Sequence, residues 1–108
     1  MSFDNPSRGS AKTVTADYIV DSAATQVDFV VINNKSGSTM QLTLPSASVW
    51  KARVIRVVNY QAQTVTSATS NVAAIATGTP GTAILAGTAG KWADLESDGT
   101  NWLITAAN

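Results

Sequence analysis

Residues 91–106 read KWADLESDGTNWLITA and contain the most informative pattern in the chain. Asp98-Gly99 is the preferred pair for a two-residue type I′ turn between antiparallel strands. The flanking residues alternate, so that one side of the predicted hairpin is apolar, and a slip of one residue would destroy this division. The turn therefore predicts these opposite pairs: Ser97 with Thr100, Leu95 with Trp102, and Ala93 with Ile104.

Short β-type runs separated by turn residues continue through the rest of the chain. The clearest are residues 26–33 (QVDFVVIN) and residues 39–44 (TMQLTL). In the second run, alternation predicts that Met40, Leu42 and Leu44 point into the core. The other expected strands are residues 12–20, 52–59, 63–69, 72–77, 83–86, 91–97 and 100–106.

The run at residues 52–59 (ARVIRVVN) is apolar on both faces apart from its two arginines. Such a pattern indicates a strand that is buried on both sides. Arg53 and Arg56 are three residues apart and so face opposite sides of the strand. Two interpretations stay open for them: arginines at an exposed rim, or an ion pair with an Asp of another subunit.

Eight or nine short strands, with a turn every 8–12 residues, predict an all-β fold. We expect an antiparallel β-sandwich with a jelly-roll-like arrangement, no helix, and no repeat of 20–50 residues. Residues 12–108 are expected to form a single domain, and residues 1–11 a polar, flexible docking arm. The candidate docking residues of the arm are Phe3, Asp4, Pro6 and Arg8.

The composition excludes several classes of function. The 108 residues include seven Lys and Arg, seven Asp and Glu, no His and no Cys. Zinc sites made of His or Cys, Ser-His-Asp triads, Cys nucleophiles and disulfides are therefore excluded. Zero net charge without a basic cluster argues against nucleic acid as a partner. There is no apolar run of 18 residues and no secretory h-region, so neither a membrane partner nor a secretory signal is expected.

Only 13% of the residues are charged, which is low for the surface of a soluble monomer. This composition favours a homo-oligomer, with a Thr-rich all-β monomer as the alternative. Asp94 and Glu96 have a spacing that would suit a glycosidase pair, but a solvated strand edge explains them better. We expect no catalytic residue, no cofactor and no metal ion. Trp50 and Trp92 are the candidate aromatic residues for a surface or interface.

Residues 91–104, with SDGTNW followed by apolar residues, resemble the closing hairpin of small bacteriophage virion modules. Such modules occur at the tips of tail fibres and in head-fibre or capsid decoration proteins. The similarity extends upstream to residues 16–20 (ADYIV), residues 42–47 (LTLPSA) and the strand at residues 54–59. It thus covers about residues 12–108 and transfers no catalytic role.

The resemblance implies a compact β-sandwich that trimerises. Because only a short arm precedes the domain, the resemblance favours a decoration protein over a tail-fibre tip. The expected function is to decorate or cement the capsid surface of a virion as a homotrimer bound to the major capsid protein, without catalysis. The alternative is a tail-tip module that binds a receptor or a host surface glycan.

Overall fold

The computed structural model describes residues 10–20, 22–23 and 26–108 of the chain. The four candidate docking residues of the arm lie outside this part. The described residues form strands and turns without any helix, and therefore contain no helix that could span a membrane. The all-β prediction is confirmed. The first strand starts at Ser10, so the last two residues of the expected arm belong to a sheet.

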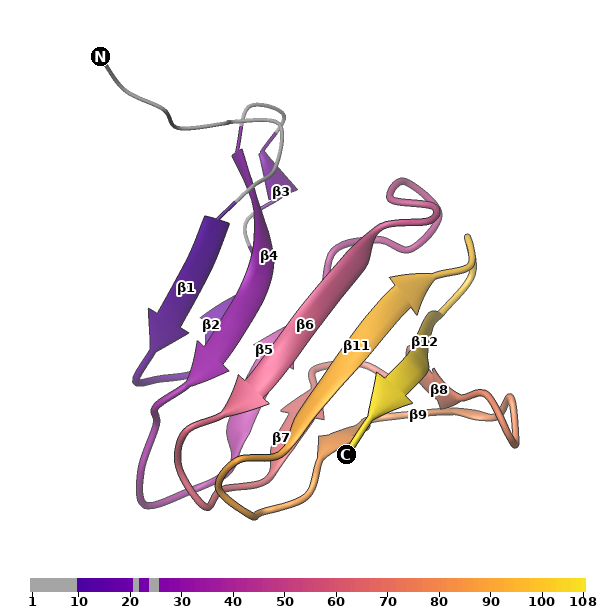
Figure 1. The fold of residues 1–108 in the computed structure, drawn as a ribbon. Helices are drawn as coiled ribbons and strands as arrows, with labels where there is room; N and C mark the ends of the chain where they lie inside the picture. The colour runs from indigo at the N-terminus through magenta and orange to yellow at the C-terminus, as the bar shows by residue number, and fades with distance from the viewer. Residues whose placement is uncertain (1–9, 21, 24–25) are drawn as a thin grey trace.

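The strands form two layers, which we name the large sheet and the small sheet (Figure 1). The large sheet contains, in spatial order, β1 (Ser10–Val14), β4 (Gln26–Asn33), β6 (Val54–Asn59), β11 (Trp92–Ser97), β12 (Trp102–Ala107), β8 (Val72–Ala74) and β9 (Pro80–Gly81), with β3 (Ser22–Ala23) beside β4. The small sheet contains β10 (Ala83–Leu85), β7 (Val65–Ser67), β5 (Met40–Thr43) and β2 (Tyr18–Ile19).

The first half of the chain winds as a stack of parallel coils. Each coil places one strand in the large sheet and the next in the small sheet: β1 then β2, β4 then β5, β6 then β7. Successive coils pair in parallel in both sheets. The later strands β10, β11 and β12 return antiparallel and close the layers.

This winding corrects the expectation of a purely antiparallel sandwich, because both sheets are mixed. The jelly-roll arrangement is not confirmed. Parallel strands need a crossover connection, and here the crossover of each coil is a strand of the opposite sheet. The coils differ in length, which explains why no repeat is visible in the sequence.

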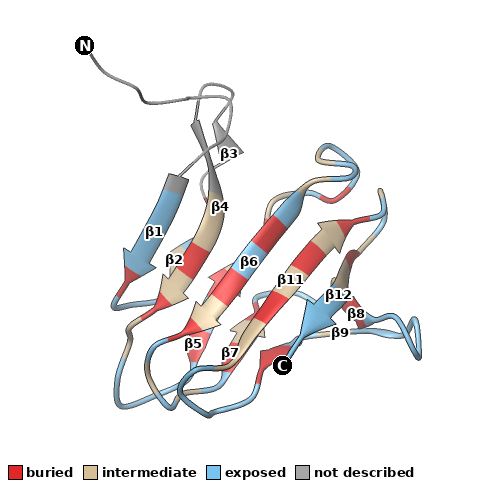
Figure 2. Cartoon of the chain, viewed as in Figure 1, coloured by how far each residue is buried: buried red, intermediate tan, exposed pale blue. Residues whose placement is uncertain are grey.

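Aliphatic side chains fill the space between the two sheets. Buried positions alternate with exposed or half-buried ones along β6, and with half-buried ones along β11, as Figure 2 shows. Met40, Leu42 and Leu44 are buried as predicted, and Trp102 is completely buried. Among the apolar residues that are almost completely buried, the largest are Trp102, Met40, Leu42, Ile55, Leu95, Val31, Val57 and Val65.

The strand predicted at residues 52–59 differs from the expectation in two ways. It begins at Val54, because Ala52 has a φ of 63° and lies outside the β region. It is also buried on one face only: Ile55 and Val57 are inside, whereas Arg56 on the other face is exposed. A single copy of the chain therefore leaves uncovered a strand face whose sequence is typical of a buried one.

The closing hairpin forms, but its predicted register is wrong. Ser97 pairs with Trp102 and Leu95 with Ile104. The carboxylate of Asp98 accepts hydrogen bonds from the N–H groups of Thr100 (2.8 Å) and Asn101 (2.7 Å), which makes a four-residue loop. The true register is shifted by two residues next to the loop, and by three beyond a β-bulge between Asp94 and Leu95, where Ala93 pairs with Ala107. Ala93, Leu95 and Trp102 of the predicted inward-facing set are buried, and Ile104 packs against the core.

Two buried side chains tie the hairpin to the segment that follows β5. The indole N–H of Trp102 donates to the carbonyl of Pro45 (2.9 Å), and the hydroxyl of Ser97 donates to the carbonyl of Ala47 (2.6 Å). Each bond spans at least 50 positions of sequence. The hairpin is thereby fixed to the core by polar contacts as well as by burial.

A buried pair of asparagines joins the second and third coils. Asn33 and Asn59 end β4 and β6, lie opposite each other, and are almost completely buried. The amide of Asn33 donates to the side-chain oxygen of Asn59 (2.9 Å). The amide of Asn59 donates in turn to the carbonyls of Gln63 (2.6 Å) and Ala86 (3.1 Å). This pair therefore satisfies backbone groups of the next corner and of the returning segment.

We predict that Asn59→Ala lowers the free energy of unfolding by about 2–4 kcal/mol, because it leaves buried donors and acceptors without partners. Urea unfolding followed by tryptophan fluorescence measures this change. Gln41→Ala is the control, since it removes an exposed carboxamide. Equal stability of the two variants would show that the asparagine pair does not hold the coils together.

Candidate functional site

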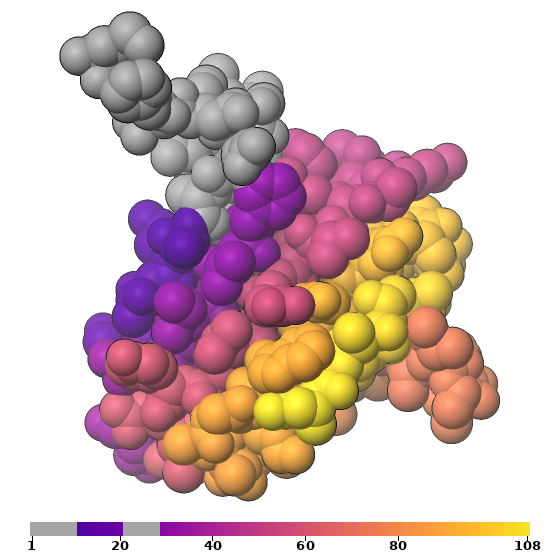
Figure 3. Space-filling model, in the orientation of Figure 1, coloured from indigo at the N-terminus to yellow at the C-terminus, as the bar shows by residue number. Residues whose placement is uncertain are grey.

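The outward side of the large sheet is the most distinctive surface of the described chain, and Figure 3 shows it facing the viewer. Its side chains are those that alternate with the buried residues of each strand. We call this surface the outer face and define it by Ala11, Thr13, Val30, Ile32, Val54, Arg56, Val58, Trp92, Asp94, Glu96 and Leu103.

An ion pair lies in the middle of the outer face. Arg56 on β6 is opposite Asp94 on β11, and its guanidinium donates two hydrogen bonds to the two carboxylate oxygens (2.7 and 3.0 Å). The hydrogen bonds from Arg56 lower the pKa of Asp94, and the carboxylate raises the pKa of Arg56. In a single copy of the chain, Arg56 is exposed and pairs with an Asp of the same chain.

Trp92 stands beside this ion pair. The guanidinium carbon of Arg56 lies 4.7 Å from the centroid of the Trp92 ring, within the range of a cation–π contact. The indole is half-buried, and β11 holds it next to Val58 of β6. The structure therefore places this candidate aromatic residue on the outer face, with one ring face occupied by the arginine.

Trp50 lies in a different place, in the turn before β6. It packs against the core and is half-buried. The guanidinium of Arg53 lies 4.2 Å from the ring centroid of Phe29 and 5.8 Å from that of Trp50. Arg53 and Arg56 thus contact different sets of residues, as their spacing predicted. The two candidate aromatic residues do not form one site.

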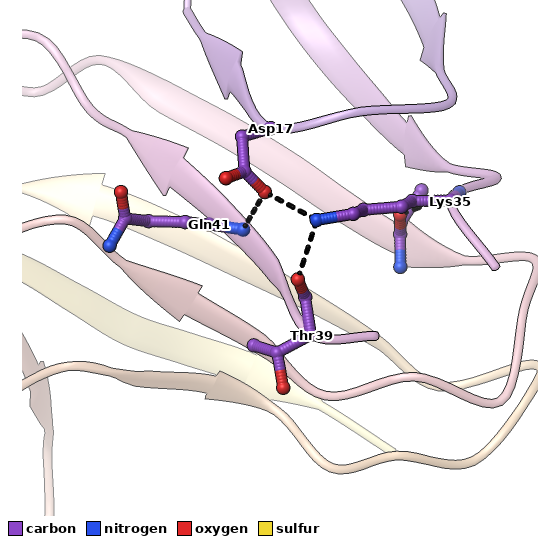
Figure 4. Close-up of polar contacts among 5 residues, drawn as sticks. Asp17, Lys35, Thr39 and Gln41 are labelled. Atoms are coloured by element: carbon purple, nitrogen blue, oxygen red, sulfur yellow. Dashed lines mark hydrogen bonds and ion pairs between the residues drawn. The ribbon is translucent and has the colours of Figure 1, made fainter. Parts of the chain in front are cut away.

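A polar cluster of Asp17, Lys35, Thr39 and Gln41 clamps the corners of the first two coils (Figure 4). One carboxylate oxygen of Asp17 accepts hydrogen bonds from the ammonium of Lys35 and from the N–H of Gln41, both at 2.9 Å. The ammonium of Lys35 also donates to the carbonyl of Thr39 (2.9 Å). The N–H of Gln41 and the ammonium both lower the pKa of Asp17. This cluster is a structural clamp on the surface.

Of the two carboxylates considered as a glycosidase pair, Asp94 binds Arg56 with both of its oxygens. Asp98, in the hairpin loop, accepts hydrogen bonds from the N–H groups of Asn101 and Thr100, and these bonds lower its pKa. Asp94 thus joins β11 to β6, and Asp98 caps the hairpin loop. Residues 10–20, 22–23 and 26–108 contain no group of three or more acidic side chains placed to hold a metal ion.

Ser48 and Lys51 have the S-x-x-K spacing of some acyl-transfer enzymes. Both residues are exposed in the turn that precedes β6. The hydroxyl of Ser48 is hydrogen-bonded to that of Ser46 (2.9 Å), and no hydrogen bond joins it to the lysine. The spacing therefore reflects a turn in this protein.

The polar residues that organise the corners were missed by the sequence reasoning. Asn33 and Asn59 each end a β-branched run, in VVIN and RVVN, and this shared ending was the available signal. Asp17 and Lys35 carry no local signal, since they meet only when two coils stack.

The depressed pKa of Asp17 predicts a pH-dependent contribution to stability. A carboxyl whose pKa is lower in the folded state stabilises the fold above its unfolded pKa, near 3.9, and this contribution disappears as the pH falls through the folded value. Asp17→Asn should therefore be less stable than the wild type at pH 7, and the difference should shrink below about pH 4. Unfolding curves of both proteins between pH 2 and 7 measure it, and a difference that stays constant would contradict the prediction.

Comparisons with known proteins assign this chain to no family. No family model, no curated protein and no solved structure matches the chain.

Proposed function

We propose that the chain is a structural protein of a bacteriophage virion. In this proposal it self-associates, with a trimer expected, and decorates or cements the capsid surface by binding the major capsid protein. It works by adhesion and catalyses no reaction.

The main support comes from the hairpin on which the resemblance rests. Asp98 caps the loop, Trp102 fills the core, and Ser97 anchors the hairpin to a distant segment. Gly99 has a φ of 94°, which favours glycine. The residues that carry the similarity are therefore scaffold residues, and what a scaffold offers to a partner is its exposed surface.

The charge distribution agrees with adhesion to protein. The chain has no net charge, and the ion pairs Arg56–Asp94 and Lys35–Asp17 neutralise charges on its surface. A neutral surface of small polar and apolar groups suits broad contact with other protein surfaces. Several copies bound together would multiply the strength of each weak contact.

Immunogold electron microscopy of purified virions, with antibody against this chain, tests the proposed location. We expect gold over the head, and virions treated with pre-immune antibody are the control. Gold at the tail tip would instead support the receptor-binding or glycan-binding alternative, and screening against glycans would follow. Virions without any label would contradict both.

Removal of the arm tests the docking step. Because β1 begins at Ser10, deletion of residues 2–9 removes no residue of the described strands. We expect the deletion to abolish co-sedimentation with capsids that lack the protein, while circular dichroism remains that of the full chain. Phe3→Ala should weaken binding less than the complete deletion. Undiminished binding by the truncated chain would eliminate the arm as the docking element.

A further inference from the structure

The outer face carries more apolar surface than the exposed side of a two-layer β protein needs. Strands that cover a core on one side usually present polar residues to water on the other. Here the outward-facing positions include aliphatic and aromatic residues on four neighbouring strands, of which Val54 is exposed and the others are half-buried. These are Val30, Ile32, Val54, Val58, Trp92 and Leu103.

The pairing register arranges these residues in rows across the strands. Ile32 lies opposite Val58, which lies opposite Trp92, so that one apolar row crosses β4, β6 and β11. The row of Arg56 and Asp94 comes next, and beyond it Glu96 lies between Val54 and Leu103. Adjacent strands are about 4.8 Å apart, so these side chains touch across the sheet.

The charged groups within the outer face are suited to burial. Arg56 and Asp94 are joined by two hydrogen bonds, and the guanidinium also lies against Trp92. Covering a pair that is already joined leaves no uncompensated charge, whereas covering a lone charge is strongly unfavourable. Glu96 lies in the row nearest the hairpin loop, toward the rim, where interfaces stay hydrated.

We propose that the outer face is covered by the same face of a second copy of this chain. The chain has zero net charge, so two copies approach without repulsion. A twofold contact places the ion pair of one copy against that of the other, and one Arg and one Asp from each copy are complementary to themselves. A strongly acidic or basic partner would find no matching field here.

The size of the face sets the strength of the contact. Five strands spaced by about 4.8 Å, each contributing about six residues, span roughly 24 by 20 Å. Pairing two such faces removes about 1,000 Å² from water, which is at the lower limit for a specific interface. Sheets that pack in this way lie about 10 Å apart with interleaved side chains. The association is therefore expected to be concentration-dependent.

The inference rests on the self-association in the proposed function. It assigns the outer face to a twofold contact, which joins two copies, so the assembly it describes is a dimer and not the expected trimer. Sedimentation velocity over a wide concentration range compares the wild type with Ile32→Lys. The control is Ile75→Lys, which makes the same change at an exposed isoleucine beyond β8. We expect Ile32→Lys to raise the dissociation constant about 30-fold or more, and the control to leave it unchanged.

Each outcome has a separate meaning. An oligomeric wild type that only Ile32→Lys dissociates supports the outer face as the interface. If both variants remain as associated as the wild type, the surface assignment is wrong while self-association stands. A wild type that is monomeric at every concentration overturns the inference and the self-association in the proposed function, but leaves capsid binding to be tested by labelling.

A second measurement guards against a folding defect in the lysine variant. The chain has no cysteine, so single-cysteine variants report proximity without background. A short bis-maleimide should link two copies of Val58→Cys, and should not link Ile75→Cys. Absence of linking by Val58→Cys, in an oligomer that still forms, would also overturn the proposed interface.

Discussion

The hydrogen bond between the buried side chains of Asn33 and Asn59 is the constraint on which the coiled half of the molecule depends. Aliphatic residues tolerate small shifts along a neighbouring strand, whereas a buried carboxamide must meet its partners. Because the amide of Asn59 also binds carbonyls of the next corner and of the returning chain, one side chain aligns segments that are up to 27 positions away. Misalignment of the coils would leave several buried polar groups unsatisfied, at a free-energy cost comparable to a large part of a small domain's stability.

The early coils and the late hairpin are held to the rest of the fold by different kinds of contact. The early coils are held at their surface by the clamp of Asp17 and Lys35, and the late hairpin is held by Trp102 and Ser97 at the other end of β5. The first clamp depends on ionisation, and the second does not. Acid should therefore loosen the corner of the early coils before it affects the hairpin, because only the former loses a charged acceptor.

The outer face connects the fold to the proposed function. The strand β6 has an apolar sequence on both of its faces, and the second sheet covers only one. The ion pair between Arg56 and Asp94 neutralises the two charges in the middle of this surface. A module that holds two of its charges in a pair, and presents valine, isoleucine, leucine and tryptophan side chains beside them, is suited to the proposed assembly with copies of itself. Such assembly would also position several docking arms at once, which strengthens attachment to a capsid.

The sequence by itself determined the all-β class, most strand positions and the inward set of the hairpin, because these follow from alternation with a period of two along each strand. It also identified the turn at Asp98-Gly99, although the loop proved two residues longer on account of the Asp98 cap. The parallel stacking of coils, the asparagine pair and the joining of Arg56 to Asp94 were decided only by tertiary structure. Those features depend on which strands become neighbours, and residues up to 38 positions apart carry no periodic signal that reveals their pairing.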